Sequence, residues 1–484
     1  MKPGLVNAGD IAPFADRTAE DLGLDAVIDA MAAGDAEIAE AARAVLLAVP
    51  PGAGQVARRQ AVLSDFEQRP ELGRRLYDLG GRAVDAQREA ARAVFFTTPE
   101  TVLNRSIATL TAFVPLLREL REVAEQNRAR VSSAGLTEFF ATVTDQLDEA
   151  YLSSVTTLLG RLNMRGDLLV SARLGAGNES ESFAVRQPLP RSRGLFRRGP
   201  AAGGPTASYK IPHGDEAGHR AVSSLRDQAL AGLAGAADHS AAQVLSFFTS
   251  LRTDVAFYLG CLNLREALTA RGAPVCLPAV HDAESGEFSA RGLYDPSLQL
   301  RLDQPVVGND LDADGMKLIM VTGANRGGKS TFLRSVGLAG LMAGAGLHVA
   351  ATSLTTSARA GVFTHFTQDE DAGSKFDEEL RRMSELTGVL GPHSLLLCNE
   401  SFQSTNEREG SAVARHLVDA LTETGVTVVF VTHLHELASS GYEDRDRFPA
   451  LFLRADRDRS FSLRAAAPEA TSHGADLWNR LRHG

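Results

Sequence analysis

The spacing of apolar residues divides the chain into a helical first part and a mixed second part. In residues 1–160, apolar side chains recur at three- and four-residue steps, the pattern of helix faces packed against their neighbours. The clearest run spans 101–130, and Thr98 is predicted to cap its start. Pro115 lies inside this run and predicts a kink or a break. Similar patterns predict helices in 58–67, 70–77 and 216–271.

The pattern changes to short strand-like segments between residues 165 and 212. Residues 167–174 and 182–186 are typical of strands, and 187–206 is rich in Pro, Gly and Arg. We interpret this part as a small β insertion that carries a flexible loop. The loop arginines either touch a polyanion or lie on a solvated loop, and we favour the solvated loop. They are Arg191, Arg193, Arg197 and Arg198.

Short apolar segments alternate with helical patterns from residue 302 onward. This alternation predicts an α/β fold with a parallel sheet and a ligand at the carboxyl ends of its strands. The turn-rich stretch 274–301 marks a boundary. We therefore predict a mainly α-helical domain at 1–290, with its insertion at 165–212, followed by an α/β nucleotide-binding domain at 291–484. The predicted strands lie in 318–321, 362–366, 394–400 and 426–433, and the predicted helices begin at 331 or cover 376–390 and 411–422.

Composition narrows the class of protein. The 484 residues carry a net charge of −10, so bulk positive charge does not hold nucleic acid here, and any DNA contact must be local or formed by enclosure in a multimer. Three widely spaced cysteines predict neither a disulfide framework nor a zinc site. The sequence shows no apolar run long enough for a membrane span and no signal peptide. We expect a cytoplasmic protein without a membrane partner.

Residues 323–330 fit the phosphate-binding pattern G-x-x-x-x-G-K-[ST] between a predicted strand and a predicted helix. Backbone N–H groups of such a loop point at phosphate oxygens, and the helix N-terminus adds partial positive charge. Lys329 can reach the β- and γ-phosphates of ATP, and the Ser330 hydroxyl can bind Mg²⁺. The residues predicted to bind the nucleotide here are Gly323, Ala324, Asn325, Arg326, Gly327, Gly328, Lys329, Ser330 and Thr331.

Two further strand ends are predicted to meet this loop. One carries Asn399 and Glu400, and the other carries Thr432 and His433. Glu400 is the candidate to orient or deprotonate the attacking water, and it joins Ser330 and Asn399 as a candidate Mg²⁺ ligand. His433 is a candidate to bind the γ-phosphate and sense its loss. The alternatives are an ordinary surface carboxylate and an ordinary strand-end histidine.

Several motifs in these regions resemble the MutS family of DNA mismatch-repair ATPases. The run from Thr322 to Thr331 is similar to the family's T-G-P-N-M-G-G-K-S-T, and Asn309-Asp310-Leu311 precedes it as an N-D-x run does there. The run Thr432-His-Leu-His-Glu-Leu resembles T-H-x-x-E-L. The weaker resemblances are Ser374-Lys375-Phe376 with Glu379-Leu380 to S-T-F-x-x-E-M, Glu400 with Ser404-Thr405 to D-E-x-x-x-G-T, and Arg59–Leu76 to the start of the helical lever domain.

The resemblance implies an ABC-type P-loop ATPase domain preceded by a helical lever domain. In that family two ATPase domains face each other, and the signature stretch of one completes the site of the other. It therefore implies a homodimer in which Ser374 contacts the partner's nucleotide, with Lys329, Glu400 and His433 in the catalytic roles. Insertion 165–212 lies where the family's DNA clamp is inserted and is much shorter than a typical clamp.

Three departures from the family pattern shape the expected function. Asn399 stands where the family usually has Asp, which predicts weaker Mg²⁺ binding and slow hydrolysis. The F-x-E pattern occurs as Phe376-Asp377-Glu378 inside the ATPase region, and little precedes the lever-like region, so we expect no N-terminal mismatch-recognition domain. The chain ends at Gly484, soon after the Thr-His motif, so we expect no appended nuclease domain.

These features predict a MutS-like dimeric ATPase that uses ATP and Mg²⁺ to move a lever on DNA, in mismatch repair or a related repair or recombination role, with repair proteins as further partners. One alternative is an ATP-driven conformational switch that acts on a protein partner without DNA. Another is a different soluble ABC-type ATPase, which is disfavoured because the sequence contains no L-S-G-G-Q stretch.

Overall fold

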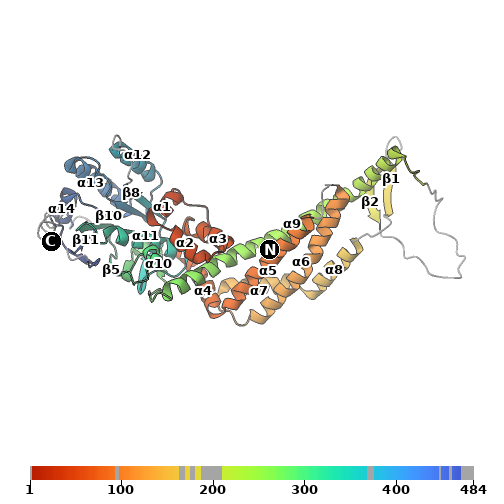
Figure 1. Ribbon diagram of the computed structural model, residues 1–484, viewed down its shortest axis with the longest axis horizontal. Coiled ribbons are helices and arrows are strands. Elements are labelled where there is room, and N and C mark those ends of the chain that lie inside the picture. Colours follow the sequence, from red (N-terminus) through yellow and green to blue (C-terminus); the bar gives the residue numbers. More distant parts are fainter. Residues whose placement is uncertain are drawn as a thin grey trace. The chain divides into compact units, whose positions relative to one another are not determined.

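The computed structural model describes most of the chain and groups it into two compact units (Figure 1). The first, here the helical unit, consists of Met1–Pro3, Leu76–Ala129 and Phe140–Arg252. The second, here the sheet unit, consists of Gly4–Arg75, Arg130–Phe139 and Thr253–Gly484. Described residues are 3–92, 98–162, 169–174, 180–186, 210–367, 375–445, 449–456 and 460–469.

The helical unit is built around α6 (Pro99–Asn127), α8 (Glu149–Leu162) and parts of α5 (Pro70–Arg92), α7 (Ala134–Gln146) and α9 (Glu216–Thr269). The predicted apolar stripe of α6 is confirmed as core, because Leu103 and Ile107 pack with Leu159 and Leu230. The predicted cap is also confirmed: Thr98 Oγ1 accepts the N–H of Thr101 at 3.3 Å.

Two predictions for this unit met different outcomes. Helix α6 runs on through Pro115, so of the predicted kink or break, the break does not occur. Proline removes one backbone hydrogen bond, and the buried side chains on both sides of it, Phe113 and Leu116 among them, hold the helix together. The predicted β insertion is confirmed as an antiparallel pair, β1 (Leu169–Leu174) and β2 (Ser180–Arg186). Residues 187–206, with their four arginines, lie outside the described residues.

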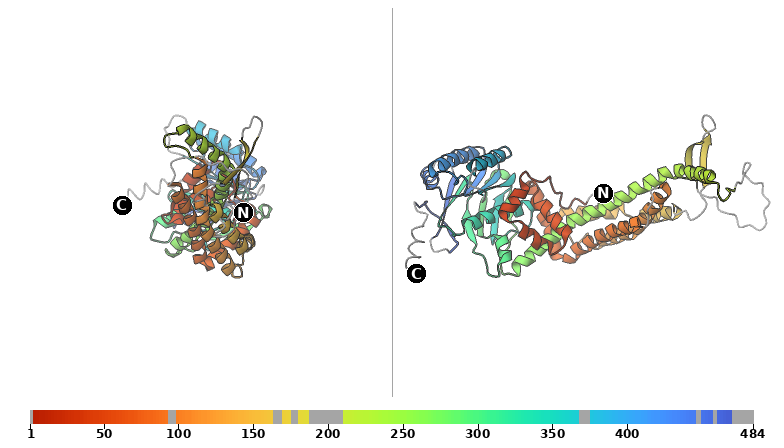
Figure 2. Two further views of the ribbon diagram at one scale, coloured as in Figure 1. Left: turned by 90° about the vertical axis from the view of Figure 1, so that its right-hand side faces the viewer. Right: turned by 45° about the horizontal axis from the view of Figure 1, so that its top comes forward.

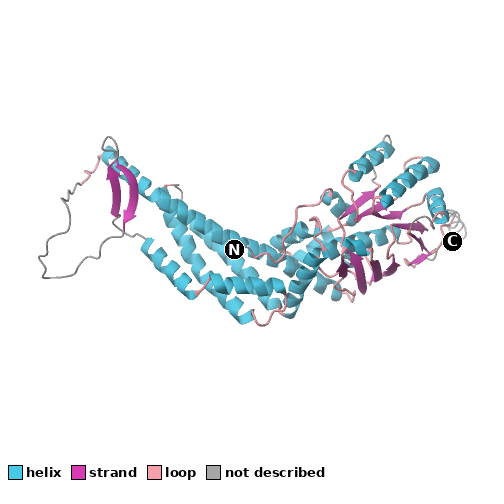
Figure 3. Cartoon of the chain, turned by 180° about the vertical axis from the view of Figure 1, so that it is seen from behind, coloured by secondary structure: helices cyan, strands magenta, loops and turns pink. Residues whose placement is uncertain are grey.

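The sheet unit holds a six-stranded sheet in the order β12-β11-β6-β10-β9-β8, which is parallel apart from β12. This confirms the predicted mixed α/β fold with a parallel sheet. A second sheet has the order β3-β7-β4-β5. Figure 3 colours the strands magenta. Their bounds are β3 Ala279–His281, β4 Phe288–Leu293, β5 Asn309–Asp312, β6 Leu318–Gly323, β7 Ser353–Ser357, β8 Gly361–Phe366, β9 Ser394–Asn399, β10 Thr427–Val431, β11 Ala450–Ala455 and β12 Leu463–Ala465.

Helices cover both faces of the six-stranded sheet (Figure 2). Side chains alternate between the faces along each strand, so Leu396 and Cys398 join one cluster with α12 (Lys375–Thr387), α13 (Glu407–Glu423) and α14 (His435–Glu443). The intervening Leu395 and Leu397 face α11 (Lys329–Ala345), where a Cβ on Gly337 would lie 2.6 Å from Leu397. Strands buried on both faces explain the continuous apolar runs of the sequence.

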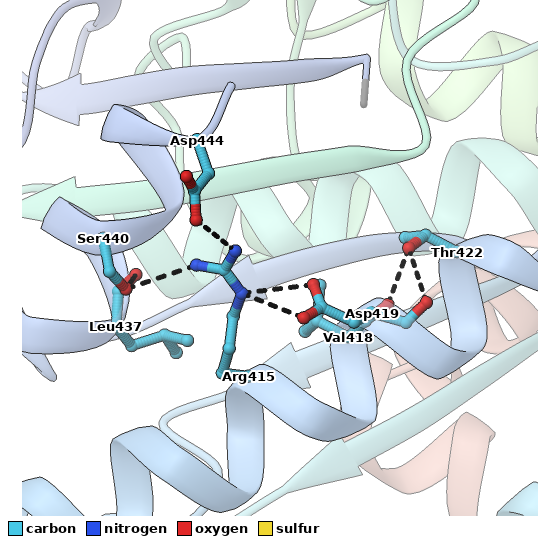
Figure 4. A network of polar contacts seen from close by, with 7 residues as sticks. All are labelled: Arg415, Val418, Asp419, Thr422, Leu437, Ser440 and Asp444. Carbon is cyan, nitrogen blue, oxygen red and sulfur yellow. Dashed lines mark hydrogen bonds and ion pairs between the residues drawn. The ribbon is translucent and has the colours of Figure 1, made fainter. Parts of the chain in front are cut away.

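Arg415 connects α13 to α14 through ion pairs and a hydrogen bond (Figure 4). Arg415 of α13 pairs with Asp419 one turn on at 3.1 Å and with Asp444, just beyond α14, at 2.7 Å. Its Nη1 also donates to Ser440 Oγ at 3.3 Å. The Arg415 side chain is only 20% exposed, so these contacts are partly shielded from water. They hold in place the helix that follows Thr432 and His433.

The N-terminal segment packs within the sheet unit. It forms α1 (Ala15–Leu22), α2 (Asp25–Ala32), α3 (Ala36–Leu46) and α4 (Ala53–Gln68), and short helix α10 (Pro296–Arg301) completes this layer. Buried Arg59 of α4 donates from Nε to Val6 O at 2.8 Å and from Nη1 to Ala345 O, at the end of α11, at 3.3 Å. In the structure, residues 4–75 and 130–139 belong to the same compact unit as residues 253–484. The predicted domain boundary at residue 290 stays a proposal.

None of the described helices combines the length and the apolar character that a membrane span requires.

Candidate functional site

Three predicted polar strand ends lie at one edge of the sheet. Strand β10 pairs with β6 on one side and with β9 on the other, both in parallel. In register, Val431 lies beside Val321 and beside Asn399. The loop after β6, the Asn399–Glu400 pair after β9 and the Thr432–His433 pair after β10 therefore meet, as the sequence predicts.

Glycines shape the loop between β6 and α11. Gly323 has φ 112° and a Cβ there would lie 2.5 Å from Ala455 O, so the loop starts in contact with β11. Gly328 has φ 91° and precedes the first residue of α11, Lys329. Both positions use backbone conformations that favour glycine. The loop therefore leads straight into the N-terminus of α11, where the helix dipole places partial positive charge.

The Lys329 side chain lies along this loop. Its Nζ donates to the carbonyl oxygens of Gly323 and Ala324, each at 3.0 Å, and the residue is 5% exposed. Burial lowers the pKa of Lys329, and the nearby Glu400 carboxylate acts in the opposite direction. A buried ammonium group with only carbonyl partners favours the approach of an anion.

The next two loop residues face different neighbours. Ser330 Oγ donates to Asn399 Oδ1 at 3.0 Å, so the predicted pair of Mg²⁺ ligands is in contact. Thr331 lines a cavity next to the loop. The two residues that precede Gly327, Asn325 and Arg326, are exposed. Arg326 has φ 61°, a left-handed conformation that few non-glycine residues adopt.

Glu400 and His433 face each other across the strand ends. His433 Nε2 lies 3.3 Å from Glu400 Oε1. The contact with His433 lowers the pKa of Glu400, burial opposes this, and Lys329 adds to the lowering. Glu400 has φ 58°, and its backbone N–H donates to Val431 O at 2.9 Å. The pair thus consists of an ionised carboxylate beside an imidazole, next to Lys329 and Asn399.

A cavity of about 360 Å³ adjoins the loop and was not foreseen from the sequence. Val306, Val307, Phe332 and Phe461 give it an apolar lining, together with Gly328 and Thr331 of the loop. Asn309 holds the Phe461 segment there: its Nδ2 donates to Phe461 O at 3.2 Å, and its Oδ1 accepts the N–H of Leu463 at 2.7 Å. The sequence hinted at this cavity only through the family resemblance of Asn309-Asp310-Leu311, which does not say which residues Asn309 contacts.

The predicted site residues therefore gather in one place, with one exception. The loop residues 323–331, Asn399, Glu400 and His433 lie around the same strand ends. Ser374, predicted to contact a partner's nucleotide, lies outside the described residues.

Two protein-family models match this chain. The MutS2 N-terminal domain matches residues 52–271, and MutS domain V matches residues 319–458. The second range contains the loop 323–331, Asn399, Glu400 and His433, whereas much of the cavity lining, Val306, Val307 and Phe461 included, lies outside it. The two ranges together cover most of the sequence.

Curated relatives match over part of their length. The chain is 33% identical over 150 residues to the DNA mismatch repair protein MutS of Chloroflexus aurantiacus, which is 29% of this chain and 16% of that protein. It is 32% identical over 169 residues to the endonuclease MutS2 of Halothermothrix orenii, 34% of this chain and 21% of that protein. It is 30% identical over 224 residues to the DNA mismatch repair protein MutS of Porphyromonas gingivalis, 44% of this chain and 25% of that protein.

These matches span a quarter or less of each relative's length. Together with the two domain matches, they show that the chain belongs to the MutS family.

Proposed function

We propose that the sheet unit contains an ABC-type P-loop ATPase domain that binds and hydrolyses ATP. The observation that carries this proposal is the meeting of three strand ends, with Lys329 and Ser330 from one, Asn399 and Glu400 from the second and His433 from the third. A phosphate loop, an oxygen-rich cation site and a carboxylate base are the parts that phosphoryl transfer to water requires.

The loop would hold the phosphates. The backbone N–H groups of residues 323–331 and the N-terminus of α11 favour negative charge. Lys329 Nζ would exchange the carbonyls of Gly323 and Ala324 for β- and γ-phosphate oxygens. This exchange trades two neutral acceptors for charged ones, so the buried ammonium gains from binding.

The donor set fits Mg²⁺. Ser330 Oγ and Asn399 Oδ1 lie 3.0 Å apart and are oxygen ligands, which this cation prefers, and Glu400 is the third candidate. When bound, Mg²⁺ neutralises charge on the β- and γ-phosphates. Asn399 contributes an acceptor oxygen without charge, so we propose weak Mg²⁺ binding and slow turnover.

Glu400 would act as the base and His433 as its neighbour on the γ-phosphate side. The pKa of Glu400 is lowered, so the carboxylate is ionised at neutral pH and can orient or deprotonate a water. His433, 20% exposed and 3.3 Å from that carboxylate, would fix its direction and respond to loss of the γ-phosphate. The apolar cavity beside Thr331 would take the adenine base, and Phe461 offers it an aromatic ring.

The wider function we propose is that of a homodimer in which nucleotide state moves the helical region on DNA, in mismatch repair or a related pathway and with repair proteins as partners. Support comes from the matched MutS2 N-terminal domain and from relatives named as mismatch-repair proteins. In this proposal Ser374 contacts the partner's nucleotide, the dimer is isologous and the protein is cytoplasmic.

ATP binding by the Lys329→Ala variant tests the nucleotide site. We expect binding to be lost, because the loop loses its only lysine and with it the ammonium group that would contact the β- and γ-phosphates. Lys317→Ala is the matched control, since Lys317 directly precedes β6, at the end away from the loop, and this variant should bind ATP as the native chain does. Native affinity in the Lys329→Ala variant would refute the site.

A titration with duplex and branched DNA separates the DNA function from a switch that acts on a protein partner. The net charge of −10 is the feature that keeps this second candidate open. We expect DNA binding that weakens strongly between about 50 mM and about 200 mM salt, because phosphate contacts release counterions. An ATPase that binds no DNA at low salt, with or without ATP, would favour the protein-partner switch.

A further inference from the structure

The short segment that follows β9, Glu400 to Phe402, has an unusual backbone. Glu400 has φ 58° and Phe402 has φ 65°, so two non-glycine residues within three positions are left-handed. Such conformations are unfavourable and persist only where the surrounding structure holds them. Ser401 and Phe402 are fully buried, so contacts in the protein interior must stabilise this backbone conformation. The direction of the Glu400 side chain depends on this segment.

Glu379 of α12 makes one of the contacts that stabilise this backbone conformation. Its Oε2 accepts the backbone N–H of Phe402 at 2.7 Å, in a residue that is only 4% exposed. Its Oε1 is buried and has no hydrogen-bond partner among the residues that the structure describes. A buried carboxylate with one unpaired oxygen costs free energy, which a purely structural acceptor would avoid.

His365 of β8 makes a second set of stabilising contacts, and it connects Ser401 to Glu379. Its Nε2 lies 3.1 Å from the backbone carbonyl of Glu379, so that nitrogen carries the proton and donates. Its Nδ1 lies 2.7 Å from Ser401 Oγ, and that hydroxyl donates to the backbone carbonyl of His365 at 2.9 Å. Burial lowers the pKa of His365 to about 4, which keeps the ring neutral in this arrangement. The ring also stacks on Phe402, with centroids 5.6 Å apart.

Helix α12 therefore contacts the segment directly through the Glu379 carboxylate, and its backbone reaches the segment only through His365. Phe376, at the start of α12, adds an edge-on ring contact with Phe402 at 6.5 Å. The rest of the helix turns a different face to solvent, where Arg381 pairs with Glu378 and Glu385. A displacement of α12 would pull on the N–H of Phe402, two residues from Glu400.

We propose that Glu379 is a positioning residue for hydrolysis: its carboxylate fixes the left-handed segment 400–402 and thereby aims Glu400 at the attacking water. This inference rests on the proposed function, in which Glu400 is the base. Glu379 reaches the reaction only through the backbone of Phe402, and it has no contact with the phosphate loop among the described hydrogen bonds. It should therefore influence the rate of hydrolysis and leave nucleotide binding alone.

The test compares Glu379→Ala, Glu379→Gln and Glu385→Ala in the full chain. Single-turnover ATP hydrolysis, ATP affinity and thermal unfolding are measured for each. In Glu379→Ala we expect hydrolysis to fall by ~100-fold, because a misaimed group loses about that much, with ATP affinity within about twofold of native. Glu385→Ala removes a carboxylate from the exposed face of the same helix and should match the native chain in rate and affinity.

Glu379→Gln separates positioning from general stability. The amide keeps an acceptor for the Phe402 N–H but makes a weaker bond than a carboxylate, so we expect a rate ~10-fold below native and above that of Glu379→Ala. Because the amide keeps the side chain's volume and an acceptor for this N–H, thermal stability should stay level while the rate falls. This combination is not expected of a residue that only stabilises the fold.

The outcomes are distinct. A native rate in folded Glu379→Ala, or an affinity that falls as much as the rate, would overturn the proposal. If Glu379→Ala does not fold, Glu379→Gln decides, and a native rate there overturns it. Absence of ATP hydrolysis by the native chain would instead refute the proposed function, before any variant is compared.

Discussion

Ser330 Oγ and Asn399 Oδ1 are hydrogen-bonded at 3.0 Å, so the first turn of α11 and the end of β9 present two oxygens to one point. The contact matters because an amide fills a position where the family usually has a carboxylate. An amide oxygen is a weaker ligand for Mg²⁺ because it brings no negative charge. Asn399 is therefore the residue whose substitution tests what limits the rate of ATP hydrolysis.

The Asn399→Asp substitution should raise both Mg²⁺ affinity and the hydrolysis rate. The added charge lies beside the Ser330 hydroxyl, where a cation would bind. We expect a rate increase of ~10-fold, which corresponds to ~1.4 kcal/mol of barrier. Steady-state ATPase rates across a Mg²⁺ titration measure both effects. Asn406→Asp is the matched control, because Asn406 caps α13 and an aspartate caps a helix equally well. Equal rates in the native chain and Asn399→Asp would show that the amide does not slow hydrolysis.

Glu400→Ala should stop hydrolysis and retain ATP. The substitution removes the only carboxylate that faces His433 among the described ion pairs, and it leaves Lys329 and Ser330 in place. Loss of a general base lowers rates by ~100-fold or more. Single-turnover hydrolysis and retention of labelled ATP on the protein report the two effects separately. Glu423→Ala, at the exposed end of α13, serves as the control. Persistence of the native rate in Glu400→Ala would remove Glu400 from the role of base.

Phe461→Ala should weaken ATP binding without changing the rate at which bound ATP is hydrolysed. Phe461 lines the cavity beside Thr331 and is 50% exposed, so a base in the cavity would cover part of its ring. Losing that contact should raise the dissociation constant by ~10-fold, about 1.4 kcal/mol. A titration with ATP and with inorganic triphosphate distinguishes the cause, because triphosphate has no base and its affinity should stay the same. A parallel loss for both ligands would place the effect in the loop.

The strand ends were predictable because their signal is local. An apolar run followed by polar residues marks the end of a buried strand, and parallel strands bring such ends to one edge. This local signal is enough to place Lys329, Asn399, Glu400 and His433 at the same edge of the sheet. Helix α6 and its Thr98 cap followed from spacing in the same way.

The remaining contacts join segments that are distant in sequence, and no spacing rule relates such segments. Asn309 bonds to the Phe461 segment 152 positions away, which creates the cavity beside the loop. Arg59 bonds to Ala345 O across 286 positions and brings α4 to the end of α11. In the sequence Glu379 belongs only to a loose family resemblance, and its bond to Phe402 forms only when α12 packs beside the end of β9.

A buried carboxylate in the sheet unit predicts a measurable dependence of stability on pH. Asp254 of α9 accepts the backbone N–H of Leu5 at 2.8 Å, and burial raises its pKa to about 6 from the ordinary 3.8. The hydrogen bonds from Leu5 and Val6 and the nearby Arg59 only partly oppose this rise. Between these two pH values the folded state binds more protons than the unfolded state. The free energy of unfolding should therefore fall as pH rises from about 4 to about 6 and then level off.

Asp254→Asn should remove this slope. The amide keeps an acceptor for Leu5 and cannot ionise, so the variant should gain stability relative to the native chain as pH rises, by at most roughly 3 kcal/mol at 1.36 kcal/mol per pKa unit. Chemical unfolding at a series of pH values from about 4 to about 7.5 gives the difference directly. Asp238→Asn is the control on the same helix, because Asp238 is half exposed and pairs with Arg105 at the surface. If the difference between Asp254→Asn and the native chain stayed constant across this range, Asp254 would not carry the buried charge, and the junction of α9 with the N-terminal segment would owe its stability to other contacts, such as the bond from Tyr258 to Leu5 O at 2.7 Å.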